Sequence, residues 1–174
     1  MQTNSRWILT ALTLVALSAC KQSDQPAASR SADSATAAAP SISPAAESLS
    51  MMASNPKVGN WKGVGTKQDG MLVTNGTAGY LMFGPYANLK AGTYNVEVKG
   101  AIRSIGTGQK VVFDAVSNKG SKRLGVLDVT AVPQSGDVIA AFPITLPEDV
   151  KDLEIRANVP TDADLSISGY TVTK

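Results

Sequence analysis

Apolar and polar residues alternate along much of the chain from about residue 52 onward. In the stretches 94–99 (YNVEVK) and 153–159 (LEIRANV), apolar residues occupy every second position. Alternation with a period of two is typical of a β-strand with one buried and one solvated face. Alternating or continuous apolar runs of this kind predict seven strands, at residues 80–86, 93–102, 110–118, 124–130, 138–145, 153–159 and 165–172.

Turn-forming residues separate these runs. Asn75-Gly76 is the strongest hairpin signal among them, and it predicts a hairpin between 71–74 and a strand that begins near Gly79. No stretch keeps a helical period, although residues 148–152 fit a single helical turn. Short strands at regular spacing predict an all-β fold over residues 52–174, an antiparallel β-sandwich or barrel of about eight to nine strands.

The first nineteen residues have the order of a secretory signal. One positive charge, Arg6, precedes an apolar run at 7–16, and the small residues Ser18 and Ala19 follow. A charged, an apolar and a small-residue region in this order are typical of exported proteins. The apolar run is shorter than the ~20 residues that a membrane-spanning helix needs, so we interpret residues 1–19 as a signal peptide.

The run Leu17-Ser18-Ala19-Cys20 resembles the lipobox of bacterial lipoproteins. The resemblance implies that a diacylglycerol is attached to the sulfur of Cys20, that cleavage occurs before it, and that lipid holds the protein on a membrane. Stable anchoring needs two or more membrane signals, which two or three acyl chains supply. Lys21 stands where an Asp tends to retain such proteins at the inner membrane, which favours the outer membrane. The alternative is an ordinary signal peptide with an incidental cysteine.

Residues 20–50 are predicted to be a disordered linker after the lipidated cysteine. Ala, Ser and Pro make up 20 of the 30 residues at 21–50, and only Ile42 and Leu49 are large and apolar. Such a segment buries too little apolar surface to offset the entropy of ordering it. As a flexible coil it would extend over roughly 30 Å, so we expect the folded part to stand away from the membrane.

Composition excludes several classes of function. The chain has no histidine and a single cysteine, so a Ser–His or Cys–His nucleophile pair and a cysteine-based zinc site cannot be built. No metal site or cofactor is predicted. The net charge of +2 gives no basic field for nucleic acid. These observations favour a protein that binds a partner and is not an enzyme.

Two stretches resemble galactose-binding-like or carbohydrate-binding-like jelly-roll domains. They are YLMFGPYANLKAGTYNVEV at 80–98 and DLEIRANVPTDADLSISGYTV at 152–172, with VVFDAVSNKG at 111–120 as the central strand. The resemblance implies a jelly-roll β-sandwich. Within it, Gly84-Pro85 would interrupt an edge strand, where proline is tolerated, and Tyr94 would pack inside.

Four residues are candidates for ligand binding. Sugar binding uses a flat aromatic side chain for the apolar face of the ring and planar polar groups for the hydroxyls. Trp61 lies in a turn-rich stretch with Asp69 nearby, Arg156 lies on the predicted wet face of a strand, and Asp114 is a carboxylate on a central strand. If the N-terminal strands fold over that sheet, Trp61 and Arg156 share a surface. The alternatives are that Trp61 closes one end of the sandwich and that Arg156 is a cross-strand partner of Asp or Glu.

Two acidic groups resemble calcium ligands by composition only. Glu148, Asp149 and Asp152 form one group, and Asp162 and Asp164 form the other. Hard cations prefer carboxylate oxygens, but neither spacing is specific, and solvated turns are the favoured interpretation.

Two functional hypotheses follow from these observations. In the first, the sandwich binds a glycan of the cell envelope or an exopolysaccharide. In the second, it is an envelope assembly or structural lipoprotein that docks a protein partner, for example by strand addition at an exposed edge.

Overall fold

The computed structural model describes residues 48–174, so the predicted signal peptide, Cys20 and nearly all of the predicted linker lie outside the described residues. The described residues form an all-β fold without a helix, and so without a helix that could span a membrane. They contain eleven strands: β1 (Ser48–Met52), β2 (Thr66–Gln68), β3 (Met71–Val73), β4 (Gly79–Met82), β5 (Pro85–Leu89), β6 (Gly92–Ser104), β7 (Val111–Ser117), β8 (Lys122–Val129), β9 (Val138–Leu146), β10 (Val150–Val159) and β11 (Asp164–Thr173).

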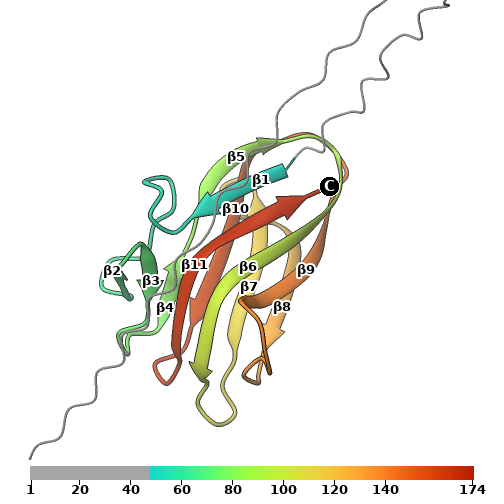
Figure 1. Ribbon diagram of the computed structural model, residues 1–174. Coiled ribbons are helices and arrows are strands. Elements are labelled where there is room, and N and C mark those ends of the chain that lie inside the picture. The colour runs from blue at the N-terminus through green and yellow to red at the C-terminus, as the bar shows by residue number, and fades with distance from the viewer. Residues whose placement is uncertain (1–47) are drawn as a thin grey trace, which may run out of the picture. The chain divides into compact units, whose positions relative to one another are not determined.

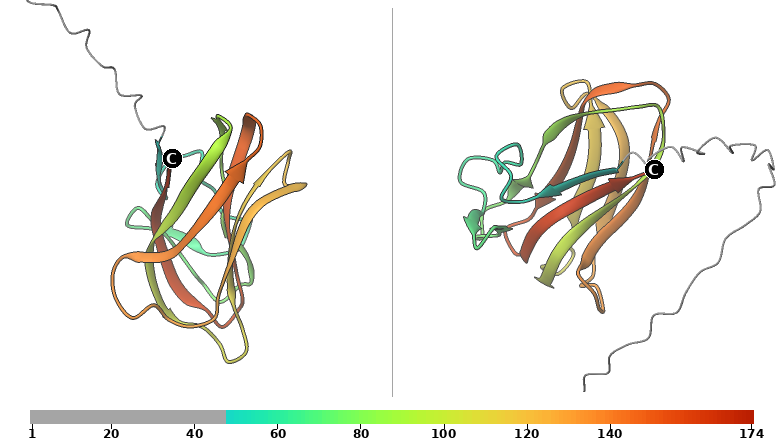
Figure 2. Two further views of the ribbon diagram at one scale, coloured as in Figure 1. Left: turned by 90° about the vertical axis from the view of Figure 1, so that its right-hand side faces the viewer. Right: turned by 45° about the horizontal axis from the view of Figure 1, so that its top comes forward.

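The strands form two antiparallel sheets that face each other, as the edge-on view in Figure 2 shows. One sheet has the order β2-β3-β11-β6-β9, and β1 also pairs with β11. The other has the order β4-β10-β7-β8, and β5 also pairs with β10 (Figure 1). Both β4 and β5 are therefore edge strands beside β10, and β10 is the strand on which the candidate site is built.

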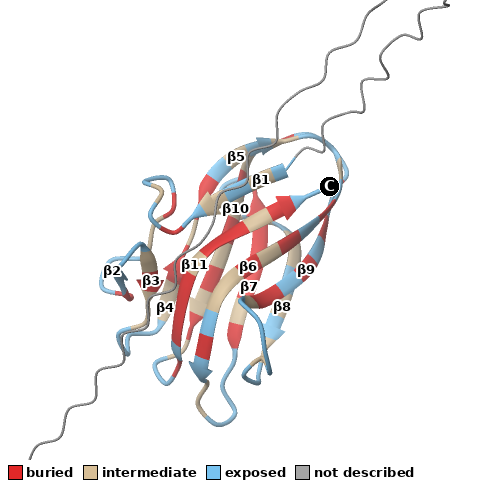
Figure 3. Cartoon of the chain, in the orientation of Figure 1, coloured by how far each residue is buried: buried red, intermediate tan, exposed pale blue. Residues whose placement is uncertain are grey.

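The core lies between the two sheets, and the alternation in the sequence determines which residues enter it. In β10, Leu153, Ile155, Ala157 and Val159 are at most 1% exposed, whereas the residues between them face outward. Figure 3 shows the resulting change between buried and more exposed positions along the strands. Full burial of a Leu or Ile side chain contributes about 1.5–3 kcal/mol. The predicted β-sandwich is confirmed.

The predicted strand at 80–86 is two strands, β4 and β5, with the break at Phe83-Gly84. Gly84 has a φ of 119°, and a Cβ there would lie 2.2 Å from the carbonyl oxygen of Lys57, so only glycine fits this close approach. Pro85 follows on an edge strand, where its missing N–H leaves no gap in the ladder. The predicted interruption at Gly84-Pro85 is confirmed. The other expectation from the resemblance concerns Tyr94 on β6, which is 2% exposed and packs inside as expected.

The hairpin expected at Asn75-Gly76 is wrong. The chain passes there from β3 in one sheet to β4 in the other, so the two strands do not pair. The hairpin in this part of the chain joins β2 to β3 instead. Its turn is Asp69-Gly70, with φ values of 51° and 78°, and two consecutive positive φ angles are the geometry that Asp-Gly favours.

Two further boundaries differ from the sequence analysis. The first described strand, β1, begins at Ser48, ahead of the predicted domain start at residue 52, and it pairs with β11 from Ser48 opposite Thr173 to Met52 opposite Gly169. Residues 148–152 form no helical turn, because β10 begins at Val150 and places its buried side chain in the core.

Candidate functional site

The loop at 57–65 places Trp61 beside β4. The N–H of Trp61 donates to the carbonyl of Tyr80 at 2.8 Å, and Gly59 and Phe83 exchange two backbone hydrogen bonds of 2.9 Å each. The loop therefore pairs with the free edge of β4. It holds Trp61 at the surface, where the residue is 63% exposed. The alternative that Trp61 is a buried lid of the sandwich is wrong.

Side chains fasten this loop from within. The Nδ2 atom of Asn60 donates to the carbonyl of Val64 at 2.6 Å. Asn75 reaches the loop from the chain beyond β3: its Oδ1 accepts from the N–H of Gly65 at 2.9 Å, and its Nδ2 donates to the carbonyl of Gly63 at 3.1 Å. Such bonds substitute for the ladder that a loop lacks, so the backbone that holds Trp61 is fixed before a ligand arrives.

Arg156 and Asp114 form a bidentate ion pair under the same surface. Nε of Arg156 donates to Oδ1 of Asp114 at 2.8 Å, and an Nη atom donates to Oδ2 at 2.6 Å. The two residues are register partners on β10 and β7, and Asp114 is only 3% exposed. Arg156 is thus a cross-strand partner of Asp, as one alternative proposed, but a largely buried one. Hydrogen bonding to Asp114 raises the pKa of Arg156, so its charge is permanent.

Arg156 also contacts an aromatic ring. Its Cζ lies 4.9 Å from the centroid of the Tyr80 ring, which is the range of a cation–π contact. On the other side of Asp114, Nε of Arg123 approaches Oδ2 at 3.5 Å. The carboxylate therefore fixes the guanidinium, and the guanidinium supports Tyr80.

Tyr86 presents a second exposed aromatic ring, at 53% exposure. Its φ of 62° is in the left-handed region, which costs a non-glycine residue about 1–2 kcal/mol. Strain of this kind persists where the surrounding structure enforces it, and it is concentrated at functional sites. Glu154, opposite Pro85 in the register, lies next to this segment.

Glu154 is a half-buried carboxylate whose side chain forms no hydrogen bond or ion pair with any residue from 48 to 174. Desolvation raises its pKa, Arg156 partly opposes this, and Asp114 and Asp152 add to it. Desolvation and the negative charge of Glu154 also raise the pKa of Tyr86, whereas Arg156 lowers it. Glu154 is therefore an acceptor whose hydrogen-bonding capacity is open to a ligand.

These side chains surround one open hollow of about 220 Å³ on the outer face of the sheet that contains β10. Its lining combines aromatic rings with a carboxylate, a guanidinium and an ammonium group. The residues that line it are Trp61, Tyr80, Phe83, Tyr86, Lys119, Gly120, Glu154 and Arg156. The arrangement provides flat apolar surface for stacking and polar groups of both signs for hydroxyls, without a nucleophile–base pair.

The structure brings three of the four predicted site residues together. Trp61 and Arg156 line the hollow, and Asp114 accepts hydrogen bonds from the Arg156 guanidinium. Asp69 is not part of it, because it lies in the β2–β3 turn. Sequence reasoning missed Tyr86 and Glu154 as site residues, although Tyr86 stands beside the conspicuous Gly84-Pro85 pair.

The two acidic groups lie partly between strands and partly on them: Glu148, Asp149 and Asp162 are between strands, whereas Asp152 is on β10 and Asp164 begins β11. Asp149 accepts from Lys90 and from the N–H of Ala91, and these bonds lower its pKa. Asp152 accepts from the N–H groups of Lys119 and Asn118, which lower its pKa. Within residues 48–174, no group of His, Cys, Asp and Glu is arranged to hold a metal ion.

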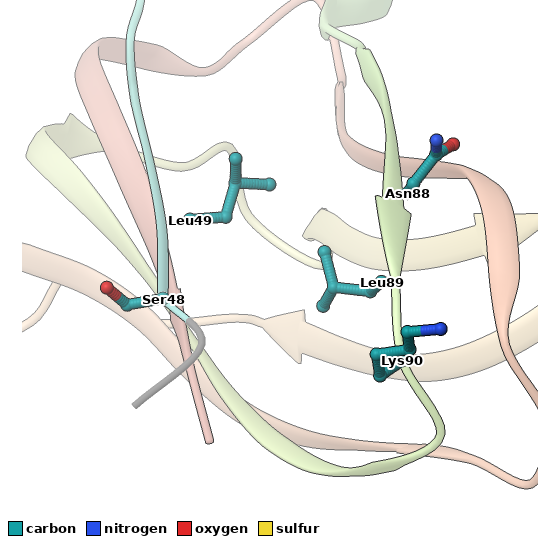
Figure 4. A pocket seen from close by; sticks show the side chains of 5 residues that line it. All are labelled: Ser48, Leu49, Asn88, Leu89 and Lys90. Carbon is teal, nitrogen blue, oxygen red and sulfur yellow. The ribbon is translucent and has the colours of Figure 1, made fainter. Parts of the chain in front are cut away.

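A larger hollow of about 370 Å³ lies elsewhere, between the edge strands β1 and β5 (Figure 4). Leu49 and Leu89 point toward each other across it, whereas Ser48 and Asn88 point away. Its lining contains no aromatic ring and no acidic side chain. It therefore lacks an aromatic ring on which a sugar could stack.

Comparison with known proteins found no matching family model and no matching curated protein. Two solved structures are similar to this chain. One is the C-terminal carbohydrate-binding module (CBM6) of the laminarinase LamC from Zobellia galactanivorans, with 17% identity over 73% of this chain and 99% of that chain and a TM-score of 0.46. The other is the carbohydrate-binding module CBM6cm-2 of lichenase 5A from Cellvibrio mixtus in complex with cellotriose, with 14% identity, coverage of 72% and 96%, and a TM-score of 0.46.

Proposed function

We propose that the β-sandwich binds a glycan, without catalysis, in the hollow beneath Trp61. The observation that supports this most is the pair of exposed rings, Trp61 and Tyr86, around the carboxylate of Glu154, which accepts no hydrogen bond from residues 48–174. Exposed aromatic rings supply stacking surface at low entropic cost, and a few fixed polar groups then orient the ligand. The envelope polysaccharides or exopolysaccharides of the producing cell are the expected ligands.

Affinity gel electrophoresis tests this proposal. Wild-type protein is run through gels that contain soluble glucans, xylan, galactan or the producing cell's own envelope polysaccharides. We expect at least one polymer to retard the wild type, and Trp61→Ala to remove the retardation. Met52→Ala is the matched control, since Met52 is 59% exposed and lies outside the hollow. Unretarded migration of the wild type in every polymer would overturn the proposal.

The protein-docking alternative predicts a different result. The hollow between β1 and β5 is apolar and lies at two strand edges, which is where an added strand would dock. A protein partner seated there would be recovered from cross-linked membranes in equal amounts by the wild type and by Trp61→Ala. Recovery of one stoichiometric protein, unaffected by competing sugars and by Trp61→Ala, would favour that alternative over the glycan.

We also propose that lipid on Cys20 holds the domain at the outer membrane. The support is the lipobox Leu17-Ser18-Ala19-Cys20. Labelled palmitate should be incorporated into the wild type and not into Cys20→Ser, and only the wild type should sediment with outer-membrane fractions. Equal labelling of both proteins would overturn this part of the proposal and leave the glycan site untouched.

A further inference from the structure

A second hollow adjoins the site and shares two of its residues. It has about 310 Å³ and is lined by Trp61, Ala78, Gly79, Tyr80 and Asn158. Trp61 and Tyr80 also line the hollow that contains Glu154. The two rings therefore stand between two adjoining depressions on one face of the sheet, and both depressions are open to solvent.

The strand β10 sets the distance between the two depressions. Glu154, Arg156 and Asn158 occupy every second position of β10 and face outward. A rise of ~3.4 Å per residue places the Cα atoms of Glu154 and Asn158 roughly 14 Å apart. One sugar ring cannot contact both side chains, whereas consecutive rings of a chain laid along β10 can.

The second depression has neutral chemistry. No charged side chain lines it. Its one amide side chain is that of Asn158, which forms no hydrogen bond with any described residue. Two of its lining residues, Ala78 and Gly79, carry little or no side chain. A neutral ring whose hydroxyls both donate to and accept from an amide fits such a surface.

We infer that the site takes the interior of a linear glycan, with one ring beside Glu154, one beside Asn158, and Trp61 and Tyr80 in contact with both. This inference rests on the proposed glycan binding and adds to it the class of ligand. Because both depressions are open, the chain can continue beyond them in either direction. The site therefore needs no reducing or non-reducing end.

Calorimetric titration with two oligosaccharide series tests the inference. The full chain is titrated with cello-oligosaccharides and laminari-oligosaccharides from monosaccharide to hexasaccharide. In the series that binds, we expect affinity to rise mainly from the monosaccharide to the disaccharide, which fills both depressions, and to level off by the trisaccharide. Asn158→Ala should weaken trisaccharide binding roughly fivefold, the equivalent of one lost hydrogen bond, and leave monosaccharide binding unchanged. Asn88→Ala, at an exposed asparagine outside both depressions, is the matched control.

The outcomes separate this inference from the proposed function. Equal affinity for the monosaccharide and the trisaccharide, or a trisaccharide affinity that Asn158→Ala does not change, would overturn the two-ring inference and leave glycan binding intact. Loss of monosaccharide binding in Asn158→Ala would also overturn it, because Asn158 would then belong to the first ring. Absence of binding to every member of both series, together with unretarded migration in every polysaccharide gel, would count against both proposals. Circular dichroism of each variant verifies that it is folded.

Discussion

The guanidinium of Arg156 lies between a buried carboxylate and an aromatic ring. Asp114 accepts two hydrogen bonds from it, at 2.8 and 2.6 Å, and the Tyr80 ring centroid lies 4.9 Å from its Cζ. The Arg156 side chain keeps only 14% exposure and the Asp114 side chain 5%. A buried pair of this kind holds its partners in one geometry, and each partner depends on the other.

Asp114→Leu should destabilise the protein strongly. The change leaves the Arg156 guanidinium buried without its principal partner, which typically costs about 3–5 kcal/mol. The double variant Asp114→Leu with Arg156→Met should recover most of this loss, because no buried charge remains. Urea unfolding followed by circular dichroism measures both effects. An Asp114→Leu midpoint equal to that of the wild type would show that the pair does not support the fold.

The same double variant separates stability from binding. It retains the fold but removes the cation that supports Tyr80, so we expect weaker retention in the polysaccharide gel than for the wild type. Unchanged retention by the folded double variant would mean that Arg156 has no part in the site.

Tyr86→Gly should reduce binding without reducing stability. Glycine relieves the left-handed strain at φ 62°, worth about 1–2 kcal/mol, and the half-exposed ring contributes little burial. We expect an unfolding midpoint equal to or above that of the wild type, together with a loss of polysaccharide retardation. Asp69→Gly is the control, because Asp69 has a φ of 51° but lies outside the hollow. If both glycine variants keep full retardation, Tyr86 is not a ligand contact.

The long strands could be predicted from the sequence because their apolar residues alternate or form continuous runs. β10 and β6 are examples, and each buries one face against the opposite sheet. The short strands carry no such signal. β2 is three exposed residues (TKQ), and β1 follows an Ala/Ser/Pro-rich segment, so only their pairing partners identify them. The hairpin predicted at Asn75-Gly76 failed for another reason. The turn preference of these two residues is local, and it does not determine which sheet the next strand enters.

The site was predictable only where a residue type is informative by itself. Trp61 is the one tryptophan that follows the predicted signal peptide, and it lies in a turn-rich stretch. Asp114 is a charge on an otherwise largely apolar strand. Tyr80 and Glu154 become site residues through topology, since β4 and β5 are far from β10 in sequence and pair with it in space. No local pattern encodes that pairing.

Asn75→Ala should loosen the Trp61 loop. The change removes the bonds from Asn75 to Gly65 and Gly63 and leaves two loop groups without these partners. We expect a loss of about 1–3 kcal/mol in the free energy of unfolding, and weaker retention in the gel because the loop is then held against β4 by its backbone hydrogen bonds alone. Asn88→Ala, at an exposed position outside the site, should change neither quantity. A stable Asn75→Ala variant with full retention would show that the loop needs no such fastening.

Glu154→Gln should raise stability at neutral pH and not at low pH. Burial raises the pKa of Glu154 above its usual 4.5. At a pH between 4.5 and the raised pKa, the folded protein therefore binds more protons than the unfolded chain. The free energy of unfolding therefore falls as pH rises through that interval. Above the interval, the destabilisation by the ionised Glu154 carboxylate stays constant. Glutamine does not titrate. Thermal unfolding should give the variant a higher midpoint at pH 7 and an equal one below about pH 4.

Asp152→Asn should behave in the opposite way. The N–H groups of Lys119 and Asn118 lower the pKa of Asp152 below its usual 3.8, so its stabilisation is present at neutral pH and is lost as pH falls through the lowered value. The asparagine variant should therefore unfold at a lower temperature than the wild type at pH 7, and the difference should disappear in strong acid. Opposite signs from two carboxylates two positions apart on β10 cannot come from a general effect of net charge. If both variants lower the midpoint at pH 7, Glu154 is not the desolvated acceptor on which the proposed site depends.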